Sequence, residues 1–256
     1  MTPCPIRSCL RIAAAQSASV PLDIDANLQR HLDFIDAAAS AHVSLLVFPE
    51  LSLCGYELAD MARVALAPDD ARLQVLLARA AATGMTIIAG APVTTRDGRP
   101  AIAALGFHPD GRTTVYRKRF LHAGEEQFAQ AGTALTQLHQ VHGVPTALAI
   151  CADTTHSQHA HAAAVSGAQL YVAGSLITPG GYAKDSAQLA GYAELYDMDV
   201  LMANHAARSG PFESAGRSAI WAAGGQLAAA APGPGECLVI ASFNEARVAP
   251  LPARAP

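Results

Sequence analysis

Short apolar segments alternate along this chain with longer segments in which apolar residues recur every three or four positions. The short segments predict buried strands and the longer ones predict amphipathic helices. The expected strands are 10–16, 44–48, 86–93, 101–108, 113–119, 147–151, 169–175, 200–205, 218–221 and 237–243. The expected helices are 25–41, 69–83, 156–167 and one within 183–198. Strands that alternate with helices and hairpins favour an α/β fold with mixed sheets covered by helices.

The chain supplies enough apolar material for one large core. It has 256 residues, of which 51% are hydrophobic and 15% charged. No proline- or serine-rich linker interrupts it, so we predict a single domain over residues 1–256. Its core is expected to span about residues 8–246, with residues 247–256 as a C-terminal tail.

Charge and hydropathy argue against several classes of protein. The net charge is −4 and the densest basic stretch, 116–119, is too short to follow a phosphate backbone, so no nucleic-acid partner is expected. No apolar stretch is long enough to span a membrane, and Arg7 and Arg11 interrupt the one that a secretory signal would need. The five cysteines, at positions 4, 9, 54, 151 and 237, fit neither a zinc site nor a disulfide framework. We therefore expect a cytoplasmic protein.

Three predicted strands are followed by reactive side chains. The segment LLVFPEL places Glu50 after a strand, TVYRKRF does so for Lys118, and ALAIC ends on Cys151. Sites in α/β proteins are commonly built at strand ends. Each residue alone has an ordinary interpretation, as a loop carboxylate, a surface cation or a core thiol. The lysine is notable because the chain has two lysines and fifteen arginines, and guanidinium cannot replace a compact ammonium.

Taken together, the segments FPELSLCGYE, YRKRFLHAGEE and LAICADTTH resemble the three signature segments of the nitrilase, or carbon–nitrogen hydrolase, superfamily. The order of Glu50, Lys118 and Cys151 and the intervals between them match. The resemblance continues through GAQLYVAGSL, ELYDMDVLMANHA and GRSAIWAAGGQLAA, so it covers nearly the whole chain. It implies a four-layer α-β-β-α sandwich and a Glu-Lys-Cys triad that needs no cofactor. It also implies a small-molecule amide as the partner and assembly into a homodimer or a larger homo-oligomer.

The chemistry of C–N hydrolysis assigns a role to each residue of the triad. Cys151 is expected to be the nucleophile, with its pKa lowered by Lys118 and by the helix that follows. Glu50 would carry the proton, and Lys118 with the backbone N–H of Ala152 would stabilise the oxyanion.

The resemblance also implies a second glutamate that positions the lysine and the substrate. We assign this role to Glu126, with Glu125 as the alternative because the GEE sequence leaves the register open by one position. His122 either lines the pocket or caps the segment, and we favour an ordinary loop residue.

Other features bear on ligands and substrate. His156, His159 and His161 are interpreted as a solvated helix face rather than a metal site. Thr154, Thr155 and His156 stand where many family members carry an arginine after the Cys-x-Asp sequence, which weakens the case for a carboxylate substrate. A small polar pocket with Tyr56 and Ser175 as walls is expected.

The function predicted is cysteine-dependent hydrolysis of a small amide or carbamoyl compound through a thioester, with release of ammonia or an amine. A nitrilase acting on a nitrile and a catalytically silent binding protein are the alternatives. A thiol redox sensor is a third, and it would need Cys54 or Cys237 close to Cys151.

Overall fold

Two mixed β-sheets pack face to face in the computed structural model of the chain, which describes residues 10–242 and 245–251. The first sheet contains, in spatial order, β13 (Glu245–Pro250), β12 (Cys237–Ser242), β1 (Ile12–Gln16), β2 (Leu45–Val47), β3 (Thr86–Val93), β4 (Ala101–Phe107) and β5 (Thr113–Arg117). The second contains β11 (Leu227–Ala230), β10 (Ala219–Trp221), β9 (Asp199–Asn204), β8 (Leu170–Ser175), β7 (Val144–Ile150) and β6 (Leu138–Val141).

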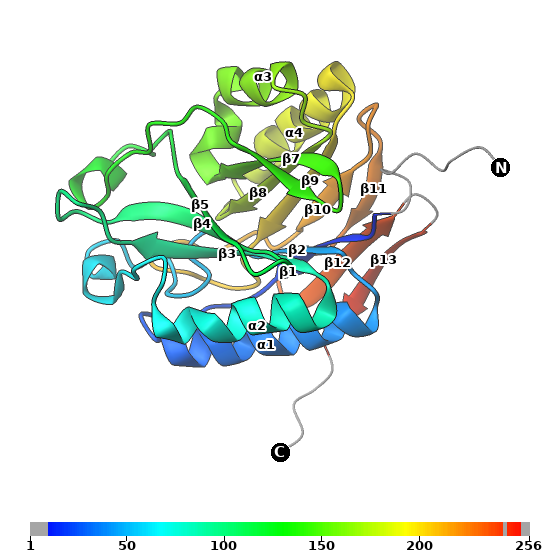
Figure 1. Cartoon of the computed structure of the whole chain (residues 1–256). Coiled ribbons are helices and arrows are strands. Elements are labelled where there is room, and N and C mark those ends of the chain that lie inside the picture. Colours follow the sequence, from blue (N-terminus) through cyan, green and yellow to red (C-terminus); the bar gives the residue numbers. More distant parts are fainter. Residues whose placement is uncertain (1–9, 243–244, 252–256) are drawn as a thin grey trace.

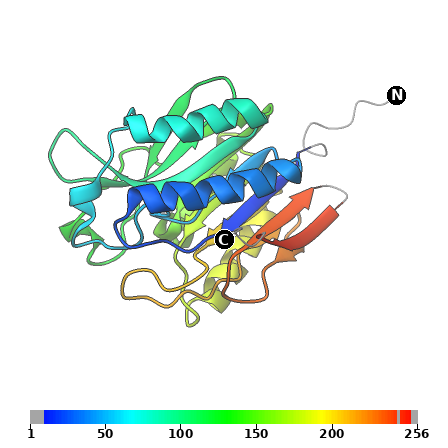
Figure 2. The same cartoon turned by 90° about the horizontal axis from the view of Figure 1, so that it is seen from below.

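Two pairs of helices cover the outer faces of the sheets. The pairs are α1 (Ile24–Ser40) with α2 (Gln74–Thr83), and α3 (Ser157–Val165) with α4 (Tyr182–Tyr196). The first pair lies beneath the first sheet and the second pair above the second sheet (Figure 1). Figure 2 shows α1 and α2 side by side across their sheet. The predicted four-layer α-β-β-α sandwich is confirmed.

The central strands read as continuous apolar segments because both of their faces are covered. Every residue of β2 and β3 is buried, whereas the edge strand β5 is mostly exposed or half-buried. In β7 the alanines Ala147 and Ala149 pack with those of α3, whereas Leu148 and Ile150 belong to the core that β7 shares with the first sheet. No helix in the described part of the chain is both long and apolar enough to cross a membrane.

Helix boundaries follow from local capping. The side chain of Asp23 accepts a hydrogen bond from the N–H of Ala26 and so begins α1, a cap that is typically worth about 1 kcal/mol. Helix α2 begins later than predicted, because a 3₁₀ turn at Ala71–Leu73 precedes it and is capped by Asp70.

The predicted C-terminal tail needs correction. Residues 245–250 form β13, which pairs antiparallel with β12 along its whole length. Residues 247–250 therefore belong to the first sheet, because their backbone groups complete its edge ladder. Residues 8, 9, 243, 244 and 252–256 of the predicted core and tail lie outside the described residues.

The topology brings strand ends together from both sheets. Strands β1, β2 and β3 are parallel in the first sheet, as are β7, β8 and β9 in the second. Strands β2 and β8 contact each other across the interface between the sheets. The loops that leave β2, β7 and β8 consequently meet, and this is where Glu50 and Cys151 lie.

Candidate active site

Glu50 is fixed by the close packing of its backbone between the two sheets. A Cβ added to Gly90 of β3 would lie 2.3 Å from the carbonyl oxygen of Pro49, and one added to Gly174 of β8 would lie 2.6 Å from that of Phe48. Glycine is therefore required at both positions. The Nε2–H of His205 donates to the carbonyl oxygen of Glu50 over 2.7 Å. The backbone of Glu50 is thus packed against a strand of each sheet, and the residue is only 1% exposed.

Lys118 lies directly after β5 and is fully buried. Its ammonium Nζ donates to Oε1 of Glu50 over 2.6 Å and to Oε1 of Glu125 over 2.7 Å. A buried ammonium is tolerated only where carboxylates neutralise it and accept its protons. Two carboxylates do so here, and among the described residues no third acceptor is within hydrogen-bond distance of this ammonium.

Cys151 follows the last residue of β7 and begins the 3₁₀ turn η5 (Cys151–Thr155). Its φ of +42° lies in the left-handed region, which is costly for a residue with a side chain. The sulfur is 3.3 Å from Nε2 of His122 and 3.8 Å from the carbonyl oxygen of Leu176. The sharp turn at the strand end aims the thiol at the cavity described below.

Asp153 ties the turn that carries Cys151 to the segment that carries Lys118. Its Oδ1 accepts from the backbone N–H groups of Arg119 and Phe120 over 3.0 and 2.8 Å. Its Oδ2 accepts from the N–H of Ile150 over 3.0 Å. One buried carboxylate therefore sets the spacing between the two strand ends.

A chain of buried hydrogen bonds supports Asp153 from behind. Tyr116 donates its hydroxyl proton to Oδ2 of Asp153, and His159 and Tyr171 continue the chain, each step over 2.8 Å. His159 is completely buried and uses both ring nitrogens. The predicted solvated face is therefore wrong for His159, although His161 is exposed.

The glutamate beside Lys118 is Glu125, not the predicted Glu126. Glu125 is 1% exposed, and its Oε1 also accepts from the hydroxyl of Tyr56. Glu126 is exposed, and its Oε2 accepts from the N–H of Gly124. The reason is the 3₁₀ turn η4 (Glu125–Gln127), which follows Gly124 and turns successive side chains to different sides.

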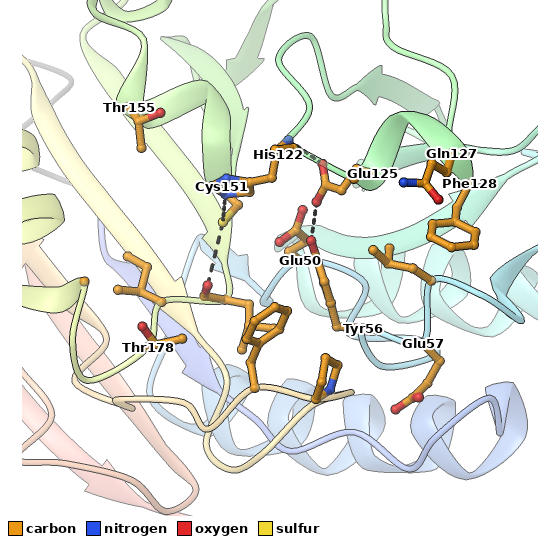
Figure 3. Close-up of a pocket in the computed structure, with 18 of the residues that line it drawn as sticks. Glu50, Tyr56, Glu57, His122, Glu125, Gln127, Phe128, Cys151, Thr155 and Thr178 are labelled. Atoms are coloured by element: carbon orange, nitrogen blue, oxygen red, sulfur yellow. Dashed lines mark hydrogen bonds between the residues drawn. The ribbon is translucent and has the colours of Figure 1, made fainter.

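The reactive groups lie at the floor of a cavity of about 700 Å³. Glu50, His122, Glu125 and Cys151 line it together (Figure 3). Apolar walls come from Leu58, Phe128, Leu176, Ile177 and Phe212.

The predicted substrate contacts are only partly at this cavity. Tyr56 lines it, whereas Ala152 and Ser175 are buried and do not appear among its lining residues. Leu176, Ile177 and Thr178, just beyond β8, take the place predicted for Ser175. His122 lines the cavity and contacts Cys151, so its interpretation as an ordinary loop residue is wrong.

Burial and charge set the protonation of the site. Burial, opposed by the charge of Lys118 and assisted by that of Glu125, raises the pKa of Glu50 to about 7. Burial and then the charge of Glu50 raise the pKa of Cys151 well above its ordinary value. Burial would lower the pKa of Lys118, but the surrounding negative charges outweigh it and raise that pKa. The resting site therefore holds an ammonium and a neutral thiol, and the expected lowering of the thiol pKa is not found.

Comparisons with known proteins agree with this geometry. The sequence profile of the carbon-nitrogen hydrolase family matches residues 11–253. The chain belongs to the carbon–nitrogen hydrolase family. The resemblance to the nitrilase superfamily is thereby confirmed, and the protein is a hydrolase.

Solved amidase structures from a Nesterenkonia species share the fold of this hydrolase. An amidase from Nesterenkonia sp. superposes with a TM-score of 0.84 at 24% identity, over 93% of this chain and 92% of that one. A cysteine-to-serine variant of the amidase from Nesterenkonia AN1, of the nitrilase superfamily, gives 0.84 at 23% identity over 92% of both chains. A cysteine-to-alanine variant with bound butyramide gives 0.82 at 24% identity, over 92% and 91%.

Proposed function

We propose that this hydrolase is a cysteine-dependent amidase that cleaves small uncharged amides through a thioester. One observation carries the proposal: Glu50 and Cys151, from the ends of two strands, line one cavity, and the buried Lys118 behind it is hydrogen-bonded to Glu50. The solved amidase with butyramide bound, and a variant of it with acrylamide added at the active-site cysteine, support an amide as the substrate class.

The first half of the reaction transfers the acyl group to sulfur. Glu50 accepts the thiol proton of Cys151 as the sulfur attacks the amide carbon. With a pKa of about 7, Glu50 can both accept and return a proton near neutral pH. It then gives the proton to the leaving nitrogen, the C–N bond breaks, and ammonia or an amine departs from a thioester.

The second half hydrolyses the thioester. Glu50, ionised again, takes a proton from water and the hydroxyl adds to the thioester carbon. The C–S bond then breaks, Glu50 returns the proton to the sulfur, and the acid is released. In both halves the negative charge on the substrate oxygen faces the third N–H of Lys118, and we place the backbone N–H of Ala152 as the second donor. One donor of this kind is typically worth about 3–4 kcal/mol in the transition state.

The charges around the cavity favour an uncharged substrate. Among its described lining residues none is lysine or arginine, whereas Glu57, Asp60 and Asp185 add carboxylates around it. A substrate carboxylate would meet repulsion there and no cationic partner among the lining residues, and the charge of Lys118 behind them is already neutralised by Glu50 and Glu125. Amides and carbamoyl compounds that carry a carboxylate are therefore expected to be poor substrates.

A matched substrate pair tests the proposal. Butyramide and succinamate have the same chain length and differ by a terminal carboxylate, so we expect hydrolysis of butyramide with a kcat/KM at least tenfold higher. Ammonia release is measured for both compounds and for butyronitrile, with Cys151→Ala as the inactive control. Intact-mass analysis of Glu50→Gln with butyramide should reveal the butyryl thioester. Hydrolysis of butyronitrile in preference to butyramide would instead identify a nitrilase, and preference for succinamate would refute the charge argument.

A further inference from the structure

His122 contacts the reacting sulfur from the cavity side. Its Nε2 lies 3.3 Å from Sγ of Cys151, and both residues line the cavity (Figure 3). Glu50, the other proton acceptor near this sulfur, is 1% exposed and is bonded to Lys118 on its buried side. The thiol therefore has an acidic neighbour on the protein side and an imidazole on the side from which substrate enters.

The backbone of His122 is fixed by the same carboxylate that holds Lys118. The N–H of His122 donates to Oε2 of Glu125 over 2.9 Å. The carboxylate of Asp185, in the first turn of α4, lines the same cavity and interacts electrostatically with His122. The ring is thus held beside the sulfur with a negative charge nearby, which is the arrangement that lets an imidazole accept a proton.

We propose that His122 is a second proton carrier of this hydrolase, accepting the proton of Cys151 from the cavity side and giving it to the leaving nitrogen. The role rests on the amidase function proposed above. As Sγ bonds to the amide carbon, the S–H proton moves to Nε2, and the negative charge forms on the substrate oxygen. The imidazolium then protonates the nitrogen, the C–N bond breaks, and the ring is neutral again.

Such a carrier matters most where Glu50 is protonated. Glu50, with its pKa of about 7, is half protonated at that pH and cannot accept a second proton. Burial and the charges of Lys118 and His156 lower the pKa of His122, while those of Glu125 and Asp185 oppose them, so the ring becomes protonated at a lower pH than an ordinary imidazole. On the acid side His122 is the acceptor that remains.

The test compares His122→Gln with a matched substitution, His161→Gln, on the exposed face of α3. We expect kcat/KM of His122→Gln for butyramide to fall about tenfold more at pH 6 than at pH 8. A carboxyl of pKa about 7 is ionised in only about a tenth of molecules at pH 6, so a variant that relies on Glu50 alone loses that factor. His161→Gln should keep the wild-type profile. A His122→Gln profile parallel to the wild type would overturn the proposal.

Iodoacetamide labelling of Cys151 gives a second readout that needs no substrate. Loss of a proton acceptor should slow labelling of His122→Gln several-fold, whereas loss of a mere wall would open the cavity and leave labelling unchanged or faster. In His122→Ala, added imidazole should restore both labelling and hydrolysis; failure to restore either overturns the proposal. If the wild type hydrolyses no amide, the amidase function fails, and the labelling arm still decides whether His122 serves the thiol.

Discussion

Glu125 and Glu126 are adjacent residues with opposite environments, so the same substitution at each gives an internally controlled test of the site. Glu125 is buried and accepts hydrogen bonds from Lys118, Tyr56 and the N–H of His122. Glu126 is exposed and accepts one from the backbone of Gly124. Replacement of either by glutamine preserves shape and removes one charge.

The expected cost of Glu125→Gln follows from these contacts. All three partners donate hydrogen bonds to the carboxylate of Glu125. In the glutamine variant one of these donors must face the side-chain NH₂ group, which is itself a donor, and so loses its acceptor. Loss of a hydrogen bond to a charged group costs about 1.5–3 kcal/mol, and an unsatisfied buried donor adds about 1–3 kcal/mol. We expect a total of about 3 kcal/mol of unfolding free energy. In a chain of this length that corresponds to a fall in Tm of about 6–12 °C.

Activity should fall because Glu125 holds the ammonium of Lys118 in place. Displacement of one oxyanion donor typically costs about 10²–10³-fold in kcat. The charge of Glu125 also contributes to the raised pKa of Glu50, so the acid limb of the residual pH profile should move to lower pH. This shift is opposite in direction to that expected for His122→Gln.

The assays are differential scanning calorimetry and kcat/KM against butyramide between pH 5 and pH 9. Glu126→Gln should match the wild type in Tm, in rate and in pH profile. Equal losses in the two variants, or a rate for Glu125→Gln within a few-fold of the wild type, would show that the contact between Glu125 and Lys118 does not support catalysis.

Three further predictions follow from packing and charge. Lys118→Arg should lose about 10²–10³-fold in kcat, because a planar guanidinium cannot place one donor between two carboxylates. The measurement is steady-state kinetics, and activity close to that of the wild type would contradict this prediction. Gly174→Ala should lower both Tm and kcat, because its Cβ would lie 2.6 Å from the carbonyl oxygen of Phe48 and displace the loop that carries Glu50; unchanged activity by the same assays would contradict this. Val165 of α3 and Leu195 of α4 are 73% and 71% exposed, so we expect these helices to mediate homo-oligomer formation, and sedimentation of only a 26.4 kDa species at micromolar concentration would refute it.

The fold was predictable because both faces of its central strands are covered. Strand β3 was predicted with its observed bounds, since eight consecutive buried residues give a strong signal. Strands β6 and β11 escaped prediction because they lie at a sheet edge and contain polar or small residues such as His139 and Gln140. The turn after β6 has positive φ at His142 and Gly143 but lacks the proline or Asn-Gly sequence that would predict a turn.

The sequence predicted those residues of the site that lie at strand ends. Residues that directly follow strands, such as Cys151, are located once the strand is located. Glu125 and His122 lie in a segment without regular periodicity, where the 3₁₀ turn decides which side chain faces inward. His159 shows the converse: its helix has weak amphipathicity, and only the buried hydroxyls of Tyr116 and Tyr171 explain its position. Such pairings join distant parts of the chain, so local sequence carries no signal for them.

The proposed catalytic groups come from different sheets, and this explains why the interface between the sheets is so tightly specified. Glu50 and Lys118 belong to the first sheet, and Cys151 belongs to the second. A shift between the sheets would separate the carboxylate from the thiol by the same amount, and small errors of position are costly in catalysis. The absence of a side chain at Gly90 and at Gly174 lets the loop that carries Glu50 contact both sheets directly. Backbone contacts, rather than flexible side chains, therefore fix the position of this loop. The site therefore forms only when the whole sandwich does, which is a physical reason for the motifs to be distributed along nearly the entire chain.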